Sequence, residues 1–453
     1  MLRIIVNSYT CCPNMGSEPG MGWNWIINLA RYCEVYVISE GEFRPLIEAW
    51  MEEQSATTSE TLKIDAVESS CWYSLKNKEW QGRVCFYWNQ VSPNVRKMCW
   101  NQGDWRFYRY YEKWQRKTAD IARRIITCEK IDILHQLNMI GFREPGYLWQ
   151  VSKETGIPFV WGPIGGMKQF PMAYAKGGGL KIRLFAFVKN VINVLQIKYD
   201  RRVKKALNQA SLLISSIPDS YEAIKNYHGL ESVIIPETGC LVDEKIRNER
   251  YSYSKLLDDK NKSVDNDSAI KLLWVGKFDF RKRLDIALRI IAELRELNVS
   301  LVVFGSGNDE QVQKAKDLIS ELDIDDMVTL MGNTSNEVVK TYMQKSDLFL
   351  FTSVNEDTST VVLEAISNEL PVICFDTCGM AAVVDSSVGV KIPLSTPSQS
   401  VKDFAEKIEY LYNHMEELQR MSDNCRARAE ELSWENKAKQ VVKLYESILS
   451  HKK

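Results

Sequence analysis

The chain has 453 residues, of which 45% are apolar and 26% are charged, and its formal net charge is −1. These values are those of an ordinary globular protein, and the length predicts two domains. No uninterrupted apolar run reaches the roughly 18–20 residues that a membrane-spanning helix needs. Lys and Arg exceed Asp and Glu in residues 1–240 and the reverse holds in the remainder, which favours an anionic partner for the first half.

Cysteine and histidine are not arranged as metal ligands. The eleven cysteines contain no Cys-x-x-Cys pair, and the four histidines are scattered along the chain. Because zinc sites need clustered Cys and His, we predict no metal centre, and we expect no other cofactor. The odd number of irregularly spaced cysteines and the lack of a secretory signal predict reduced thiols and a cytoplasmic location.

Strand-like runs alternate with helical stretches along the first half of the chain. The strand-like runs are 2–7, 35–39, 131–135, 158–161, 212–215 and 232–235, and a helical run covers 23–31. This alternation predicts a mostly parallel sheet covered by helices, forming a Rossmann-like domain over residues 1–243. Residues 244–269, rich in Lys, Asp, Asn and Ser, are predicted to be an interdomain linker.

The second half restarts with a new first strand and continues in regular alternation. The predicted strands are 271–275, 300–304, 327–331, 347–351 and 371–375, and the predicted helices are 284–297, 309–322, 336–345, 359–368 and 434–450. The fold class is therefore α/β, with a second Rossmann-like domain over 270–430. Open sheets of this kind bind ligands at the carboxyl ends of their strands, here expected in a cleft between the two domains.

Two glutamates stand eight positions apart beyond strand 347–351. Glu356 lies on the loop and Glu364 lies inside the helix that follows. Between them, Thr358, Ser359 and Thr360 offer hydroxyls and backbone N–H groups at a helix N-terminus, where the macrodipole favours an anion. Hydrogen-bond acceptors on both sides of an anion site suit a ligand with hydroxyls at its ends and phosphate in its middle. A nucleotide-sugar has that shape.

A basic loop follows the first strand of the second half. Residues 276–283 contain four cations, among them Lys277 and Lys282, which are able to neutralise a diphosphate leaving group. The alternative is a solvated basic turn. Gly305 closes the next strand, where a glycine either lets the backbone approach a ligand or serves an ordinary tight turn.

Candidate site residues of the first half follow its strands. Gly16 opens a loop that lacks the Gly-x-Gly-x-x-Gly spacing, which disfavours a dehydrogenase and favours a loop over a donor phosphate or an acceptor hydroxyl. His135 ends a predicted strand, where it is either a catalytic group or a structural histidine. Arg143 and Glu144 lie at a neighbouring strand end and are candidates for orienting an acceptor.

Residues 171–210 combine nine Lys and Arg with one acid, and their centre forms a broad apolar helical face. Together with Lys181, Arg183 and Lys189, this helix suits the surface of an anionic bilayer. Tryptophans between 80 and 114 interleave with basic residues and would add an aromatic rim. The alternative is a buried helix and an aromatic core. No nucleic-acid motif is present, and we expect no nucleic-acid partner.

These motifs resemble the family-4 retaining glycosyltransferases of the GT-B fold (glycosyl transferases group 1), most strongly over residues 270–393. The Glu-x7-Glu motif of the family corresponds to Glu356 and Glu364, and its Gly-Arg-Leu-x-x-x-Lys phosphate motif corresponds to 276–282. The resemblance implies two Rossmann-like domains that face each other across a cleft. It also implies that the last helix, within residues 431–453, crosses back to pack on the first domain.

The resemblance also implies a role for each matched residue. Glu364 would hold the ribose hydroxyls, Glu356 would hold the transferred sugar, and Lys277 and Lys282 would bind the diphosphate. Lys277 stands where the family usually has Arg. A lysine lacks the planar guanidinium that binds a phosphate through two parallel hydrogen bonds, so the resemblance does not imply which nucleotide-sugar is the donor. The loop that begins at Gly16 would face the donor.

His135 matches a strand-end histidine of the family and would lie near the sugar and the acceptor. The implied reaction is retaining, metal-independent hexosyl transfer from a UDP- or GDP-sugar to a saccharide acceptor. Our leading hypothesis is a lipid-linked acceptor in surface polysaccharide biosynthesis (capsule, O-antigen or exopolysaccharide), with the enzyme peripheral on the inner membrane face. The alternatives are a soluble small-glycoside or disaccharide synthase, a non-catalytic nucleotide-sugar-binding protein, and an epimerase.

Overall fold

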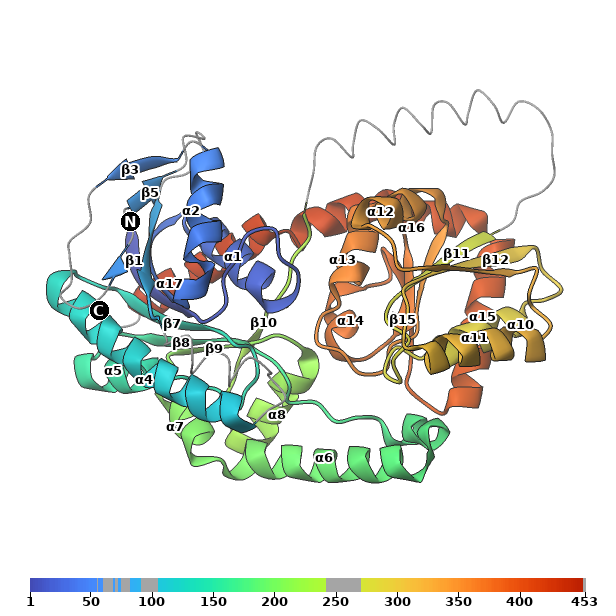
Figure 1. Cartoon of the computed structure of the whole chain (residues 1–453), viewed down its shortest axis with the longest axis horizontal. Coiled ribbons are helices and arrows are strands. Elements are labelled where there is room, and N and C mark those ends of the chain that lie inside the picture. Colours follow the sequence, from blue (N-terminus) through green and yellow to red (C-terminus); the bar gives the residue numbers. More distant parts are fainter. Residues whose placement is uncertain are drawn as a thin grey trace. The chain divides into compact units, whose positions relative to one another are not determined.

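The computed structural model describes residues 1–54, 56–59, 68–69, 72–74, 82–90, 105–241 and 270–450. The chain forms two units, each made of separate stretches of sequence (Figure 1). Unit 1 comprises Met1–Lys168, Asn193–Glu237 and Trp434–Lys453, and unit 2 comprises Gln169–Ile192 and Thr238–Ser433. The predicted linker 244–269 lies outside the described residues.

Unit 1 is built on one sheet. Its strands are β1 (Leu2–Ser8), β2 (Cys33–Ser39), β3 (Thr57–Ser59), β4 (Glu68–Ser69), β5 (Trp72–Ser74), β6 (Arg83–Trp88), β7 (Ile133–Asn138), β8 (Phe159–Ile164), β9 (Leu212–Ser215) and β10 (Val233–Ile234). They lie in the order β10-β9-β8-β7-β1-β2-β6-β5-β3, with β4 also paired to β6. Strands β3, β4 and β5 pair antiparallel at one edge, and the other pairings are parallel, as the sequence predicts.

Helices cover both faces of this sheet (Figure 1). They are α1 (Ser17–Leu29), the short η1 (Gly41–Phe43), α2 (Arg44–Glu53), α4 (Trp105–Cys128), α5 (Leu148–Thr155), α7 (Arg201–Gln209), α8 (Pro218–His228) and α17 (Trp434–Ser450). Successive strand residues alternate between the faces: Ile4 and Val6 pack with α1, α2 and α17, whereas Ile5 packs with α4, α5 and α7. Two buried faces explain why the strands read as continuous apolar runs.

Helix α17 packs on the elements that begin the chain. Its buried residues Trp434, Ala438, Val441 and Tyr445 recur every three or four positions and form one apolar face. Trp25 of α1 meets Trp434 edge to face, with the ring centroids 5.8 Å apart. The last helix therefore belongs to the core of unit 1.

Unit 2 holds a second, fully parallel sheet. Its strands are β11 (Ile270–Val275), β12 (Val299–Phe304), β13 (Val328–Gly332), β14 (Leu348–Phe351), β15 (Val372–Phe375) and β16 (Gly389–Ile392). They lie in the order β13-β12-β11-β14-β15-β16. This is the doubly wound order in which the chain runs outward from the first strand, then returns to its other side. The switch point lies between β11 and β14.

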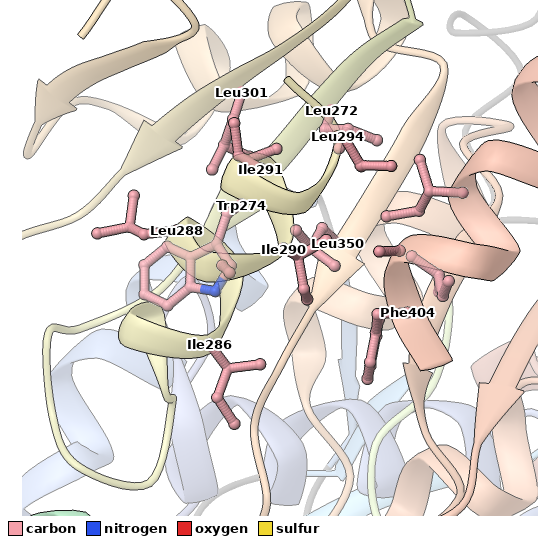
Figure 2. Close-up of a cluster of buried hydrophobic side chains, with 14 of the residues drawn as sticks. Leu272, Trp274, Ile286, Leu288, Ile290, Ile291, Leu294, Leu301, Leu350 and Phe404 are labelled. Atoms are coloured by element: carbon pink, nitrogen blue, oxygen red, sulfur yellow. The ribbon is translucent and has the colours of Figure 1, made fainter. Parts of the chain in front are cut away.

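Helices cover both faces of the second sheet as well. They are α10 (Leu284–Glu293), α11 (Asp309–Glu321), α12 (Asn336–Lys345), α13 (Thr360–Ser367), α14 (Cys378–Val383), α15 (Pro397–Asn413) and α16 (Met415–Glu431). Ile286 and Ile290 of α10 gather with Trp274 of β11 and Phe404 of α15 in the core on one face (Figure 2). Removing a side chain as buried as Ile290 costs about 2–5 kcal/mol, so this core keeps β11 and the loop after it in place.

Most predicted elements of both halves are present, with ends displaced by a few residues. Helix α1 begins at Ser17 rather than at 23, because its glycine-rich first turns look like a loop in sequence. Strand β7 continues to Asn138, so the prediction of a strand ending at His135 is wrong. Strands β3, β4, β5 and β6 of unit 1 and elements α14, β16, α15 and α16 of unit 2 were not predicted. Among the described residues, no helix is long and apolar enough to cross a membrane.

Candidate active site

The switch point of unit 2 brings two predicted motifs together. Strands β11 and β14 pair in parallel, so both end at the same edge of the sheet. The basic loop 276–283 follows β11, and the loop 352–359, which carries Glu356, follows β14. The crevice outside the carboxyl ends of the strands at a switch point is where doubly wound sheets bind ligands. The candidate site therefore lies where the fold favours one.

Thr352 joins the two loops. The indole Nε1 of Trp274 donates to Thr352 Oγ1 at 3.0 Å, and this hydroxyl is positioned to donate to the backbone oxygens of Lys282 at 2.8 Å and Arg283 at 3.0 Å. Thr352 and Trp274 are both buried, and hydrogen bonds shielded from water hold their geometry well. The backbone at Lys282 is thus fixed relative to the end of β14.

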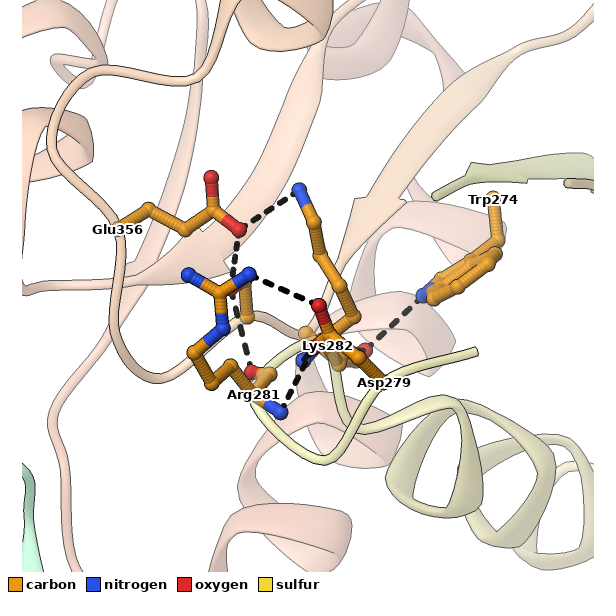
Figure 3. Close-up of polar contacts among 7 residues, drawn as sticks. Trp274, Asp279, Arg281, Lys282 and Glu356 are labelled. Carbon is orange, nitrogen blue, oxygen red and sulfur yellow. Dashed lines mark hydrogen bonds and ion pairs between the residues drawn. The ribbon is translucent and has the colours of Figure 1, made fainter. Parts of the chain in front are cut away.

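Lys282 and Glu356 form the central ion pair of this site. Lys282 Nζ lies 2.7 Å from Glu356 Oε1, and the two side chains are 14% and 15% exposed. Ser353 Oγ donates to the same Glu356 oxygen at 3.3 Å. Figure 3 shows the ammonium and the carboxylate pointing toward one another from the two loops. An ammonium has three N–H donors and a carboxylate has two oxygens, so one contact uses only part of what each group offers.

Asp279 holds the turn that presents Lys282. Its Oδ1 accepts from the backbone N–H groups of Arg281 at 2.9 Å and Lys282 at 3.2 Å, and its Oδ2 accepts from Arg281 Nη2 at 2.8 Å. Burial alone would raise the pKa of Asp279, but the guanidinium and the two amides outweigh burial and lower it. A carboxylate that stays ionised keeps this turn closed.

Arg283 ties the same loop to the segment before α6 (Gly179–Tyr199). It is 3% exposed, has a φ of 53°, and its guanidinium pairs with both oxygens of Asp285 at 2.8 and 2.7 Å. Its Nη1 also donates to the backbone oxygen of Tyr174 at 3.1 Å. Tyr174, in the short helix η2 (Met172–Gly178), is fully buried, and its hydroxyl lies 2.6 Å from Ser400 Oγ. Sequence reasoning counted Arg283 only as a cation of the loop.

Gly305 allows the ends of β11 and β12 to approach closely. It has a φ of +118°, and a Cβ at this position would lie 1.9 Å from the backbone oxygen of Gly276. No other residue type fits both conditions. The backbone that Gly305 approaches is that of the basic loop, which fits its interpretation as a tight turn; its approach to a ligand stays a prediction.

The helix that carries Glu364 starts beside these loops. Thr358 and Ser359 are buried just before α13, whereas Thr360, its first residue, is exposed. Gly379 makes room for Thr358, because a Cβ on Gly379 would lie 2.4 Å from Thr358 Oγ1. Burial raises the pKa of Glu364, against a smaller lowering by Lys340.

Two other predicted residues, Lys277 and Gly16, are exposed. Lys277 is on the basic loop and is exposed. Gly16 is the exposed N-cap residue of α1, and a Cβ there would meet nothing within 4 Å. Both positions are therefore open to a ligand.

His135 is an interior residue of unit 1. It is 1% exposed, its Nε2 lies 2.7 Å from the backbone oxygen of Gly162, and its Nδ1 lies 2.6 Å from the hydroxyl of Tyr445. Burial lowers its pKa to about 4, so the ring is neutral, with Nε2 donating and Nδ1 accepting. Both ring nitrogens are occupied, so of the two sequence readings we retain the structural histidine and leave His135 out of the proposed catalytic set.

Arg143 and Glu144 are also largely withdrawn from solvent. The Arg143 guanidinium donates to the side-chain oxygens of Asn193 and Gln196 on α6. Glu144 is 6% exposed, and burial raises its pKa to about 7. Arg143 therefore positions α6 rather than offering a free guanidinium to an acceptor.

Membrane or acceptor contact was also predicted for Lys181, Arg183 and Lys189, and all three are exposed on α6. Of the two interpretations of the tryptophans, an aromatic rim or an aromatic core, the aromatic core holds for Trp88 and Trp114, which are 3% and 2% exposed. The other tryptophans predicted for this rim have no described side chain.

Comparison with known proteins places the candidate site within a recognised sequence family. Residues 257–428 match the family described as Glycosyl transferases group 1. The D-inositol 3-phosphate glycosyltransferase of Corynebacterium aurimucosum is 25% identical over 184 residues, covering 39% of this chain and 43% of that protein. The N-acetylgalactosamine-N,N'-diacetylbacillosaminyl-diphospho-undecaprenol 4-alpha-N-acetylgalactosaminyltransferase of Campylobacter jejuni is 34% identical over 115 residues, covering 24% of this chain and 30% of that protein. The match thus spans less than half the length of each curated relative.

Solved structures resemble the whole chain. The Anabaena protein HepE, crystallised with UDP, aligns over 99% of this chain and 100% of its own, with a TM-score of 0.56 and 14% identity. An identity this low shows the fold alone. Residues 257–428, which hold the Lys282–Glu356 pair, are therefore a glycosyl transferases group 1 segment, and the fold around them is that of the GT-B glycosyltransferases.

Proposed function

We propose that this protein is a glycosyltransferase that moves a hexosyl group from a UDP- or GDP-sugar to a saccharide acceptor with retained configuration. The observation that carries the proposal is the Lys282–Glu356 ion pair at the switch point of unit 2, within the matched family segment. The pair places a cation and a hydrogen-bond acceptor side by side, which suits the junction between a diphosphate and a sugar.

Each group of the site has a role in binding the donor. Lys282, joined by the exposed Lys277, neutralises the diphosphate, and the N-terminus of α13 at Thr358, Ser359 and Thr360 adds backbone N–H groups and a favourable dipole. Glu356 accepts hydrogen bonds from hydroxyls of the transferred sugar. Glu364, further along the same helix, accepts them from the ribose. The loop beginning at Gly16 leaves room for a ligand to approach the backbone, and Gly305 holds the basic loop close to the end of β12.

The reaction follows from where charge develops. The bond between the anomeric carbon and the diphosphate oxygen breaks, and the acceptor oxygen bonds to that carbon on the same face. The departing diphosphate takes the acceptor proton, and the ammonium groups stabilise its developing charge. This step needs no nucleophile from the protein, and neither a metal nor a cofactor takes part in it.

The acceptor we propose is a lipid-linked saccharide in surface polysaccharide biosynthesis, with the enzyme peripheral on the cytoplasmic face of the membrane. Two observations support this choice. The Campylobacter relative is named for action on a diphospho-undecaprenol saccharide. Helix α6 also exposes basic and apolar side chains together.

A soluble small-molecule acceptor is the second candidate. It is favoured by the Corynebacterium relative, which is named for action on D-inositol 3-phosphate. A panel that contains both lipid-linked saccharides and soluble sugar phosphates separates the two, because only one class supports acceptor-dependent release of nucleotide.

The test of the proposal is release of UDP or GDP from a panel of nucleotide-sugars. We expect Lys282→Ala and Glu356→Gln to lower kcat/KM by at least about 100-fold, since each removes charge stabilisation at the reacting centre. Lys314→Ala is the matched control, because Lys314 forms an ion pair with Glu310 in which both side chains are 72% exposed. It should leave kcat/KM unchanged.

Equal activity in Lys282→Ala, Glu356→Gln and the wild type would contradict the proposed site. Calorimetry on the same proteins distinguishes the non-catalytic alternative. Tight binding of a nucleotide-sugar without turnover for any acceptor would indicate a binding protein. Conversion of the nucleotide-sugar without any acceptor would indicate an epimerase.

A further inference from the structure

Helix α6 turns its polar side toward the protein. Asn190 Nδ2 donates to the backbone oxygen of Phe170 at 2.9 Å, and the backbone N–H of Phe170 donates to Asn190 Oδ1, also at 2.9 Å. The side-chain oxygens of Asn193 and Gln196 accept from Arg143. These three amides are spaced three positions apart and lie on one face of the helix. Their hydrogen bonds fix the rotation of α6 about its axis.

The opposite face of α6 is apolar and exposed. Leu180 is 83% exposed, Phe185 is 69% exposed and Leu184 is 64% exposed. The exposed stripe consists of Leu180, Leu184, Val188, Val191, Leu195 and Tyr199, flanked by Phe185, Phe187 and Ile192. A surface helix normally buries its apolar stripe and exposes its polar one. Helix α6 buries Ala186 and Ile197 beside Asn193 but exposes most of its apolar side chains. An exposed apolar patch of this extent indicates a surface that another phase or molecule covers.

The charged residues of α6 all have the same sign. Helix α6 (Gly179–Tyr199) contains no Asp or Glu, and its four cations are exposed: Lys181, Arg183, Lys189 and Lys198. Long basic side chains can lie along an apolar surface while their charged ends reach the headgroup layer. The apolar stripe and its cations together match the two layers of an anionic membrane interface.

We propose that α6 lies in the plane of an anionic bilayer, with its apolar stripe among the acyl chains and its cations at the lipid phosphates. The orientation is in-plane because, among the described helices, α6 included, none is long and apolar enough to cross a membrane. A second copy of the chain is a poorer occupant, since two α6 helices face to face would bring eight cations together without an acid. The inference rests on the proposed function in one respect: the lipid-linked acceptor proposed there would lie in the same membrane surface that α6 binds.

The test is flotation of the full-length protein with vesicles of phosphatidylcholine, alone or mixed with phosphatidylglycerol. We expect binding to the anionic vesicles that weakens as salt rises, and little binding to the neutral ones. Phe185→Ser with Phe187→Ser should weaken binding at least tenfold. Lys181→Gln with Arg183→Gln should weaken it about 25-fold, since each cation near an anionic surface contributes about fivefold.

Matched controls change residues of the same kind elsewhere on the surface. Leu46→Ser in α2 removes an apolar side chain that is 54% exposed. Lys402→Gln with Lys407→Gln removes two exposed cations from α15. Both controls should float like the wild type. This result would show that α6 contacts the vesicle, because removing a charge or an apolar group elsewhere on the surface does not weaken binding.

Two outcomes would overturn the proposal. One is a wild type that does not bind anionic vesicles. The other is a wild type that forms a dimer which Phe185→Ser with Phe187→Ser converts to a monomer, which would make this face an interface between copies. Flotation needs no turnover, so a protein that floats but transfers no sugar would refute the proposed transfer reaction alone. An active protein that does not float would refute this inference and the membrane location proposed for the enzyme, and would leave the transfer reaction standing.

Discussion

Gly305 occupies a backbone conformation, φ +118°, that residues with a side chain rarely adopt, and it touches the loop that carries Lys282. We expect Gly305→Ala to lower the free energy of unfolding by about 3 kcal/mol or more, because strain at this φ adds to a Cβ placed 1.9 Å from a backbone oxygen. Urea denaturation measures the loss. Gly156→Ala is the control: its φ is +72° but its Cβ would meet nothing within 4 Å, so it should cost only about 1 kcal/mol. Equal costs would show that close approach at Gly305 is unimportant.

His135 makes the stability of unit 1 depend on pH. Burial lowers its pKa from 6.5 to about 4, so between these values the unfolded chain binds more protons than the folded one. Stability is therefore full above pH 6.5 and falls as the pH drops, by up to about 3 kcal/mol from this group near pH 4. Urea denaturation of wild type and His135→Gln across this range checks it. The difference in unfolding free energy between the two proteins should shrink as pH falls, and a constant difference would contradict the assignment.

At the residue level, the sequence predicts site residues that belong to a recognisable motif. It does not predict residues whose role depends on contacts made only in the folded protein. The spacing of Glu356 and the clustering of cations around Lys282 pointed to one site, and the structure brings these two together at 2.7 Å. Thr352 was missed because it bonds the backbone of a loop that is distant in sequence. Asp279 was missed because its hydrogen bonds form only when its own loop folds into a turn. The structural role of His135 depends on Tyr445, over three hundred residues away.

At the scale of elements, the segment before α6 supports the basic loop. We expect Tyr174→Phe to destabilise the protein by about 1–2 kcal/mol, because it removes the hydroxyl that bonds Ser400 and the backbone N–H of Ser395 inside the core. It should also raise the KM for the donor, because the hydroxyl fixes Tyr174 in the core and the backbone oxygen of Tyr174 accepts from Arg283, next to Lys282.

Thermal unfolding and donor titration measure the two effects of Tyr174→Phe. Tyr227→Phe on α8 is the control, because Tyr227 is 42% exposed. Loss of stability with an unchanged KM would mean that Tyr174 supports the core without positioning the loop.

Elements were predicted best where apolar periodicity is strong and turns are short. From β11 to β15 the strands have two buried faces and the helices have one. The apolar pattern of the sequence therefore predicts the βα alternation without further information. Helix α6 illustrates the limit. Its composition predicted a helix that either is buried or meets a membrane, and only the hydrogen bonds of Asn190 and Asn193 show which face turns inward. Apolar periodicity predicts that a helix has an apolar and a polar face, but it does not predict which face packs against the protein.

At the scale of the whole molecule, the end of the chain completes the core of the unit formed by its beginning. We expect Val441→Asp in α17 to lower the free energy of unfolding by more than about 3 kcal/mol, because Val441 is fully buried and a lone carboxylate there has no partner. Lys443→Asp, at an exposed position of the same helix, should change it little. Chemical denaturation compares them, and similar stability of both variants would show that α17 is not part of the core.

The division into units was predictable only in outline. The restart of strand pattern at 271–275 marks the second sheet, and α17 lies in unit 1. Residues 169–192, by contrast, were placed in the first domain, whereas they cluster with unit 2 through Tyr174. Phe170 and Ala173 pack against the same core, and nothing in the local sequence distinguishes these residues from those of an ordinary loop.

The most direct test of the central claim is a crystal structure of the protein with a bound UDP- or GDP-sugar. We expect the diphosphate about 3 Å from Lys282 Nζ, with Glu356 accepting a hydrogen bond from a hydroxyl of the sugar. A nucleotide-sugar bound away from the ends of β11 and β14, with the Lys282–Glu356 pair untouched, would contradict it.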